Sequence, residues 1–206
     1  MTKIKRAISV DELTRMKFID MDFKGRWLAS FGVPERSGIW IIWGNSGNGK
    51  TRFAMQLAKY MTQFGKVAYN TLEEGARKSM QRAIIETDMK QVSKRFMILN
   101  REPVDELVAR LRKRKSPDII IIDSFQYTGL TKKEYILLKE EFSNKLIIFI
   151  SHAEGKNPEG RPAKFVRYDA DLKIRVEGYK AFPVGRFGGG EPFVIWDEGA
   201  ASYHID

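Results

Sequence analysis

One eight-residue segment constrains the fold of this chain more than any other. Residues 44–51 read Gly-Asn-Ser-Gly-Asn-Gly-Lys-Thr and match the pattern G-x-x-x-x-G-K-[ST] in full. An apolar run rich in β-formers, residues 39–43, precedes the segment, and apolar residues at helical spacing follow from Lys50 to about Phe64. A glycine-rich loop between a buried strand and a helix is typical of phosphate-binding loops. The alternative is an ordinary glycine-rich turn.

The loop pattern assigns a contact to each part of a nucleoside triphosphate. Its glycines let the backbone wrap so that N–H groups point at phosphate oxygens, and the helix beginning at Lys50 adds its positive dipole end. Lys50 is expected to bridge the β- and γ-phosphates, and the Thr51 hydroxyl to bind Mg²⁺. The predicted nucleotide-binding residues are Gly44, Asn45, Ser46, Gly47, Asn48, Gly49, Lys50, Thr51 and Arg52.

Apolar strands alternate with helices over the first 150 residues. Further strands are predicted at 66–72, 96–99, 119–122 and 146–150, separated by helices at about 76–86, 104–113 and 132–142. Continuous apolar strands predict an α/β fold with a mostly parallel central sheet and helices on both faces. Strands at 172–176, 179–184 and 193–196, joined by glycine-rich turns, are expected as antiparallel additions at one edge.

The length of 206 residues fits one domain. Residues 1–37 are mixed and charged and are predicted to form an N-terminal arm or a helix-plus-strand lead-in to a core at 38–206. No apolar run of about 18 residues or more occurs, so a membrane span is not expected. The basic N-terminus lacks the apolar stretch of a secretion signal, and the absence of cysteine excludes disulfides. These features favour a cytoplasmic protein.

The chain is strongly basic. Lys and Arg total 36 against 26 Asp and Glu, which gives a net charge of +10. A nucleotide needs only a few of these charges, so the surplus favours contact with a polyanion, most obviously nucleic acid. The alternative is a basic surface that only keeps the protein soluble.

A carboxylate follows the most apolar strand. Asp123 comes directly after four isoleucines, at the carboxyl end of a strand in the same predicted sheet as the phosphate loop. A carboxylate there would help to hold the Mg²⁺ shell. The alternative is a polar residue that merely ends the strand.

The segment Thr71-Leu-Glu73-Glu74-Gly75 after the second strand resembles the RecA-like ATPases, which include the DnaB-type helicases and the RadA and KaiC branches. In that family the catalytic glutamate follows this strand, and Glu73 matches its position, with Glu74 as second choice. The resemblance implies that Glu73 orients and deprotonates the attacking water. Alternatively, both carboxylates stabilise the N-terminus of the next helix.

The strand at 146–150 is followed by Ser151-His152. RecA-like proteins place a γ-phosphate sensor here, usually Gln and sometimes His or Asn, so the resemblance implies that His152 is the sensor. A histidine can donate a hydrogen bond, or a charge when protonated, to phosphate oxygens. The alternative is a packed or solvated histidine.

Residues 153–168 are predicted to form a loop. In RecA-like proteins the segment after the sensor is a mobile DNA-binding loop, and basic groups on a flexible segment suit single-stranded nucleic acid. The alternative is an ordinary surface loop. The predicted nucleic-acid contacts are Lys156, Arg161, Lys164 and Arg167.

Residues 182–186, Phe-Pro-Val-Gly-Arg, resemble a hairpin of the DnaB-type helicases. There a Lys-x-Arg pair reaches the ATP site of a neighbouring subunit as an arginine finger. Arg186 matches the arginine, whereas Val184 stands at the lysine position. The resemblance implies a homo-oligomer, a ring or a filament. The alternative is an arginine in a turn.

Two functions from different classes fit these residues. The first is a Mg²⁺-dependent RecA-type ATPase acting on DNA, as a minimal helicase-like or recombinase-like motor or a repair or replication ATPase. The second is a KaiC-like regulatory ATPase switch that acts on a protein partner. A small-molecule kinase fits less well, because the Arg-rich lid common in such enzymes is not visible between the strands.

Overall fold

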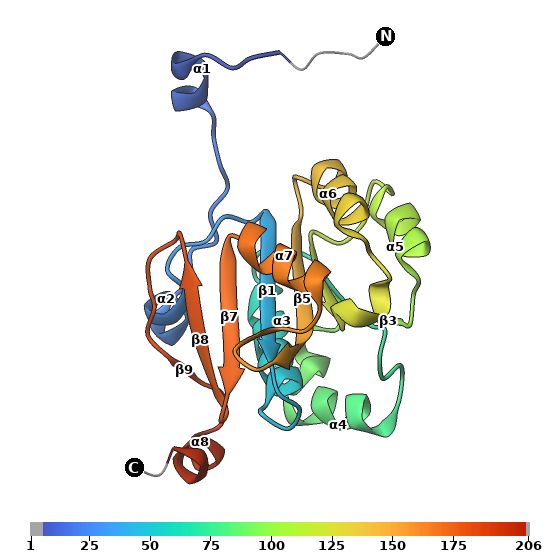
Figure 1. The fold of residues 1–206 in the computed structure, drawn as a ribbon, viewed down its shortest axis with the longest axis vertical. Coiled ribbons are helices and arrows are strands. Elements are labelled where there is room, and N and C mark those ends of the chain that lie inside the picture. Colours follow the sequence, from blue (N-terminus) through green and yellow to red (C-terminus); the bar gives the residue numbers. More distant parts are fainter. Residues whose placement is uncertain (1–5, 205–206) are drawn as a thin grey trace.

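The computed structural model describes residues 6–204 and shows one mostly parallel sheet between two layers of helices (Figure 1). Within these residues the strand order is β3-β2-β4-β5-β1-β7-β8-β9, with β6 paired to β5. The strands are β1 (Gly38–Gly44), β2 (Val67–Thr71), β3 (Phe96–Asn100), β4 (Ile119–Asp123), β5 (Leu146–Glu154), β6 (Asn157–Pro158), β7 (Leu172–Glu177), β8 (Lys180–Gly185) and β9 (Phe193–Val194). The predicted α/β class is confirmed.

The C-terminal strands differ in part from the prediction. β7 pairs with β1 in parallel, and only β8 and β9 are antiparallel additions. A parallel neighbour requires a crossover connection, usually a helix. Helix α7 (Arg161–Asp169) supplies it in the segment that the sequence predicts as a loop.

The mobile-loop prediction for residues 153–168 is therefore wrong. Strand β5 continues to Glu154, turns back into β6, and α7 begins at Arg161. Two glycines and two prolines give this stretch the composition of a loop. However, Pro162 stands in the first turn of α7, where its missing N–H has no intrahelical partner to lose.

Helices cover both faces of the sheet and complete two apolar cores. Alternate residues of β1 serve the two cores: Trp40 and Ile42 face one, whereas Ile41 and Trp43 face the other. The first core is closed by α2 (Gly25–Phe31), α3 (Lys50–Met61) and α4 (Lys78–Glu86). The second is closed by α5 (Val104–Leu111), α6 (Lys132–Glu141) and α7; α7 lies in front of the strands in Figure 1 and α3 behind them.

Shorter elements complete the path of the chain. Two 3₁₀ turns are η1 (Met89–Val92) and η2 (Phe125–Thr128), and α8 (Asp197–Tyr203) is the last helix described. Helix α6 begins at a capping box in which Thr131 and Glu134 satisfy each other's backbone N–H groups. No helix within residues 6–204 combines the length and apolar character needed to cross a bilayer.

The lead-in before β1 is a helix that packs into the first core. Phe23, Trp27 and Phe31 are buried there, and the Trp27 ring centroid lies 4.3 Å from that of Phe193. The expected strand in this lead-in is reduced to a single bridge between Asp20 and Glu35. This aromatic cluster fastens α2 to the outer edge of the sheet.

Helix α1 (Val10–Arg15) stands away from the rest of the molecule (Figure 1). None of its residues is buried. We call residues 8–19 the arm. Its exposed large apolar side chains are Ile8, Val10, Leu13, Met16, Phe18 and Ile19. Such a row on one segment is typical of a surface that another molecule covers.

Candidate functional site

The segment between β1 and α3 adopts the conformation of a phosphate-binding loop. Gly47 and Gly49 have φ values of 78° and 93°, which a residue with a Cβ rarely adopts. Asn48 fastens the loop from outside, because its side-chain oxygen accepts a hydrogen bond from the Gly178 N–H at 2.7 Å. The backbone of this loop therefore wraps around an open space at the N-terminus of α3.

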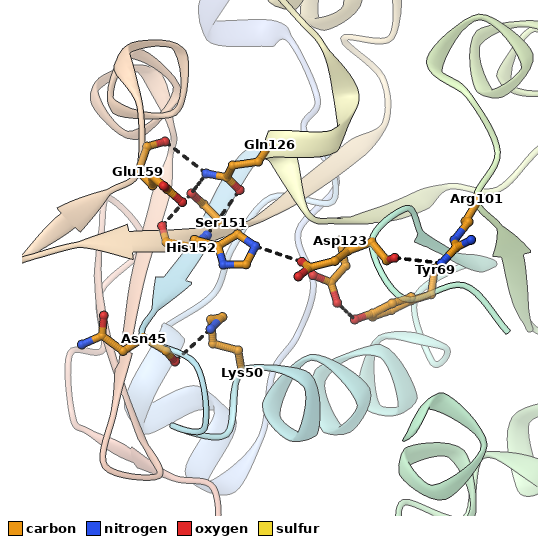
Figure 2. Close-up of polar contacts among 10 residues, drawn as sticks. Asn45, Lys50, Tyr69, Arg101, Asp123, Gln126, Ser151, His152 and Glu159 are labelled. Atoms are coloured by element: carbon orange, nitrogen blue, oxygen red, sulfur yellow. Dashed lines mark hydrogen bonds and ion pairs between the residues drawn. The ribbon is translucent and has the colours of Figure 1, made fainter. Parts of the chain in front are cut away.

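Lys50 occupies the mouth of this loop. Its ammonium group donates to the Asn45 carbonyl at 2.9 Å, so the side chain folds back over the loop (Figure 2). Burial lowers the pKa of Lys50, while the carboxylates of Asp123 and Glu73 act in the opposite direction. A desolvated ammonium beside two carboxylates is well placed to bind phosphate oxygens.

Asp123 ends β4 and lies largely enclosed at the same pocket. Burial raises the pKa of its carboxyl to about 6. The Tyr69 hydroxyl, which donates to Asp123, opposes this shift, whereas the charges of Glu73 and Glu74 add to it. The pocket thus holds a carboxylate that is costly to keep charged without a cation.

Glu73 and His152 contact each other across the pocket. The Nε2 atom of His152 lies 2.9 Å from a carboxylate oxygen of Glu73, and each side chain is about one-third exposed. Glu73 follows β2, and its backbone N–H donates to the Asp123 carbonyl at 3.2 Å. His152 lies opposite Gly44 in the parallel pairing of β5 with β1. Sheet register therefore brings these two groups to the phosphate loop.

Gln126 holds His152 from behind. Its side-chain oxygen accepts from the His152 backbone N–H at 3.3 Å, and its amide nitrogen donates to the Ser151 hydroxyl and the Glu159 carbonyl (Figure 2). Gln126 belongs to η2, just after Asp123. One amide therefore connects the end of β4, the end of β5 and the turn before α7.

Arg101 fixes the segment that carries Glu73. Its guanidinium donates to the carbonyl oxygens of Glu73 and Glu74 at 3.2 and 3.0 Å. Arg101 itself has a φ of 55°, a backbone conformation that is uncommon outside glycine. These bonds hold the backbone after β2 while the carboxylate of Glu73 stays directed at the pocket.

These groups line one pocket of about 320 Å³. Its lining includes Lys50, Thr51, Glu73, Asp123 and His152, which the sequence predicts to act together. Of the other predicted loop residues, the lining contains Ser46, Gly47, Gly49 and Arg52. The structure thus brings the predicted catalytic groups to the predicted phosphate loop, and their roles stay predictions.

The pocket suits a magnesium ion. Thr51 offers a hydroxyl and Asp123 a carboxylate, both oxygen donors of the kind that Mg²⁺ prefers. Mg²⁺ usually keeps several waters and binds through one or two protein oxygens together with substrate phosphates. Within the described residues no group of three or more metal-ligating side chains occurs, and a site of this kind does not need one.

Other predicted site residues lie outside the pocket. Arg186 is 75% exposed, and its nearest carboxylate, on Asp171, is 4.0 Å away. Lys164 pairs with Glu154, and the Arg167 guanidinium lies over the Trp43 ring at 5.2 Å from its centroid. Lys156 and Arg161 are exposed. Their nucleic-acid contacts and the finger role of Arg186 stay predictions.

Sequence reasoning missed four residues that shape the pocket: Tyr69, Arg101, Gln126 and Tyr179. Tyr69 is buried in a strand that reads as apolar, and nothing in the local pattern indicates that it contacts Asp123. Gln126 carried one usable signal, because it follows Asp123 by three residues and must stay near the strand end.

Comparisons with known proteins support the fold. Models of known protein families and the sequences of curated proteins give no match. Among solved structures, the flagellar accessory protein FlaH from Methanocaldococcus jannaschii is 16% identical, with a TM-score of 0.60, over 86% of this chain and 97% of that one. A KaiC-like protein from Pyrococcus horikoshii is 18% identical, with a TM-score of 0.62, over 85% and 93%.

A third solved structure, the ATPase domain of a helicase, is 16% identical with a TM-score of 0.54. The match covers 76% of this chain and 80% of that one. This chain has the fold of the RecA-like P-loop ATPases. At these identities the likeness establishes the fold, and the chemistry has to be argued from the pocket.

The enclosed carboxylate of Asp123 predicts a gain in stability when its charge is removed. Asp123→Asn should raise the free energy of unfolding of the nucleotide-free protein at pH 7.5 by on the order of 1 kcal/mol. The amide oxygen can still accept the Tyr69 hydroxyl, and the buried charge is gone. Thermal or urea unfolding measures the difference.

pH supplies the control for this variant. Because the pKa of Asp123 is raised to about 6, the wild-type carboxyl is protonated in the folded protein well below that pH. The cost of its charge is then absent, so the stability difference should shrink as the pH falls from about 7 to about 4. A difference that stays constant over this range would contradict the account.

Proposed function

We propose that this protein is a Mg²⁺-dependent ATPase. The observation that carries the proposal is the contact between Glu73 and His152 beside a complete phosphate loop. A phosphate loop alone requires only binding of a nucleotide. A glutamate facing the loop, oriented by a histidine and next to a carboxylate suited to Mg²⁺, adds the groups that hydrolysis needs.

The reaction is an in-line attack of water on the γ-phosphate. Glu73 accepts a hydrogen bond from the water and takes its proton as the bond to phosphorus forms. Lys50 stabilises the charge that develops on the phosphate oxygens, and the loop N–H groups hold the β-phosphate. Mg²⁺, held by Thr51 and Asp123, would supply further neutralisation of the phosphate charge.

His152 couples the state of the phosphate to the rest of the chain. In the nucleotide-free protein its Nε2 atom contacts Glu73, and a γ-phosphate offers it competing acceptors. A shift of His152 acts on Gln126, which bonds its backbone N–H and also the Glu159 carbonyl before α7. The segment from β5 to α7 therefore responds to phosphate loss.

Glu73→Gln tests the hydrolytic proposal. The amide keeps the size of the side chain but cannot take a proton, so the turnover rate should fall by at least about 100-fold while ATP affinity stays within a few-fold. Phosphate release and equilibrium binding of ATP measure the two quantities. Glu74→Gln is the matched control and should keep most of the turnover; equal loss in both variants, or none in Glu73→Gln, would reject Glu73 as the base.

The polymer on which hydrolysis acts is proposed to be single-stranded nucleic acid, DNA in the first instance. The net charge of +10 supports this, as does the position of Lys156 and Arg161 beside the responsive segment. Both side chains are exposed, whereas Lys164 and Arg167 have protein partners. We expect Lys156 and Arg161 to contribute most to phosphate-backbone contacts, with Lys164 and Arg167 at the edge.

Single-stranded DNA should stimulate phosphate release and bind in a salt-dependent manner. Replacing both Lys156 and Arg161 with Ala should weaken binding and reduce the salt slope by about 2, because two phosphate contacts are lost. The control replaces Lys113 and Arg114, an exposed pair after α5, and should change binding little. Wild-type protein that neither binds single-stranded DNA nor is stimulated by it would contradict the nucleic-acid proposal.

That outcome would favour the second function, a KaiC-like regulatory ATPase that acts on a protein partner. The observation that favours it is that the match covers 93% of the KaiC-like chain and 97% of FlaH. The same pocket would then drive a change in the segment from β5 to α7 that a protein reads. The hydrolytic proposal is common to both functions.

We also propose that the chain forms a homo-oligomer, a ring or a filament. The arm supports this, because its apolar side chains are exposed in the single chain and a second copy would cover them. Arg186 is exposed and weakly paired, so in an assembly it is free to reach the nucleotide of a neighbouring subunit.

The double substitution of Val10 and Leu13 by Asp should lower the oligomeric state, because it puts charges on the apolar surface of the arm. Light scattering after gel filtration, with and without Mg²⁺ and ATP, measures the mass. Ile85→Asp, at an exposed apolar residue of α4, is the control and should leave the mass unchanged. An unaltered mass in the arm variant, or a monomeric wild type under all conditions, would contradict the proposal.

A further inference from the structure

Tyr179 has a backbone conformation that its residue type rarely adopts. Together with Gly178 it forms the two-residue connection between β7 and β8, and both residues have positive φ, 54° for Gly178 and 57° for Tyr179. Turns of this kind favour Asn and Gly, which tolerate positive φ. A bulky aromatic residue there is an outlier that the surrounding structure has to hold in place.

The phosphate loop helps to hold this turn. The backbone N–H groups of Gly178 and Tyr179 both donate to Asn48, to its side-chain oxygen and its carbonyl respectively. The Tyr179 carbonyl accepts from the Ile195 N–H at 2.9 Å. The turn and the loop therefore form one unit, and the position of the tyrosine is fixed relative to the phosphate site.

The ring of Tyr179 lies against the loop and lines the pocket. A Cβ on Gly49 would come within 2.9 Å of the ring, so only glycine leaves the ring its space. On another side the ring meets Trp196 edge to face, with centroids 5.0 Å apart. The Arg52 guanidinium lies over the same tryptophan ring. Tyr179 and Arg52 both line the pocket that holds Lys50 and Glu73.

The order of the strands gives this pocket two different ends. Glu73, Asp123 and His152 come from the ends of β2, β4 and β5, on one side of β1. Tyr179 follows β7, on the other side of β1. The phosphate loop, which follows β1, lies between the two. A nucleoside triphosphate is elongated in the same way, with the reacting phosphate at one end and the base at the other.

We propose that Tyr179 is the platform on which the base of the bound nucleotide stacks, with Arg52 beside it. This inference rests on the proposed function in that the phosphates occupy the loop with the γ-phosphate at Glu73. The base then extends toward β7, where the aromatic ring offers a flat apolar face. Stacking on one ring accepts any base, so the platform contributes affinity for nucleosides in general, with purines preferred for their larger faces.

The experiment compares ATP with inorganic tripolyphosphate, which has the same phosphate chain and no base. Equilibrium binding of both, with Mg²⁺, is measured for the wild type, Tyr179→Ala and Tyr179→Phe. Tyr179→Ala should weaken ATP binding by at least about tenfold and leave tripolyphosphate binding within about twofold. Tyr179→Phe keeps the ring and should bind both ligands like the wild type.

Two further variants separate stacking from folding. Tyr179→Gly removes the ring but suits the positive φ, so it should be at least as stable as the wild type and still lose ATP affinity. Tyr127→Ala, at an exposed tyrosine outside the pocket, should bind both ligands normally.

Three results would overturn the proposal. Unchanged ATP affinity in Tyr179→Ala and Tyr179→Gly would show that the ring does not contact the base. An equal loss of ATP and tripolyphosphate binding would show that the ring only holds the loop. A wild type that binds neither ligand would overturn the proposed function, and the base platform with it, and is distinguished by the tripolyphosphate measurement on the unaltered protein.

Discussion

The parallel pairing of β1 with β5 is the constraint on which the rest of the site depends. It sets Gly44, where the phosphate loop begins, directly opposite His152. The next pairings along the sheet, β5 with β4 and β4 with β2, bring Asp123 and the segment before Glu73 to the same edge. Because side chains alternate across a strand, a shift of one residue in any of these pairings would turn its functional group away from the pocket.

This arrangement gathers charge in a partly enclosed space, and the polar groups around it limit the cost. Asp123 keeps a raised pKa even though Tyr69 donates to it, and Lys50 has a lowered pKa although two carboxylates lie near. Arg101 and Gln126 fix backbone groups and leave the reactive side chains free to change partners. The nucleotide-free pocket is therefore destabilised locally in a way that Mg²⁺ and phosphate would relieve.

Much of the fold could be predicted from sequence because its parallel strands are continuous apolar runs, such as residues 119–122, separated by helices. The meeting of Glu73, Asp123 and His152 followed from a general rule, since the carboxyl ends of parallel strands lie at one edge of a sheet. Helix α7 was missed because glycine and proline dominate the start of its segment. The apolar spacing of Ala163, Val166 and Ala170 was the signal for a helix there.

The contacts of Tyr69 and Tyr179 could not be predicted, for a physical reason. Tyr69 reaches Asp123 across the β2–β4 pairing, 54 positions apart in sequence. Tyr179 reaches the loop through a hairpin whose turn conformation its residue type does not favour. Both depend on which strands pair and in what register. Local patterns of charge and hydrophobicity do not record that choice.

The central claim is that one pocket holds ATP with its γ-phosphate between Lys50, Glu73 and His152. A crystal structure of the protein with Mg²⁺ and a non-hydrolysable ATP analogue tests it most directly. The account predicts the triphosphate along residues 44–51, the metal between Thr51 and Asp123, and His152 turned from Glu73 toward the γ-phosphate. A nucleotide bound elsewhere, or one whose γ-phosphate points away from Glu73, would contradict it.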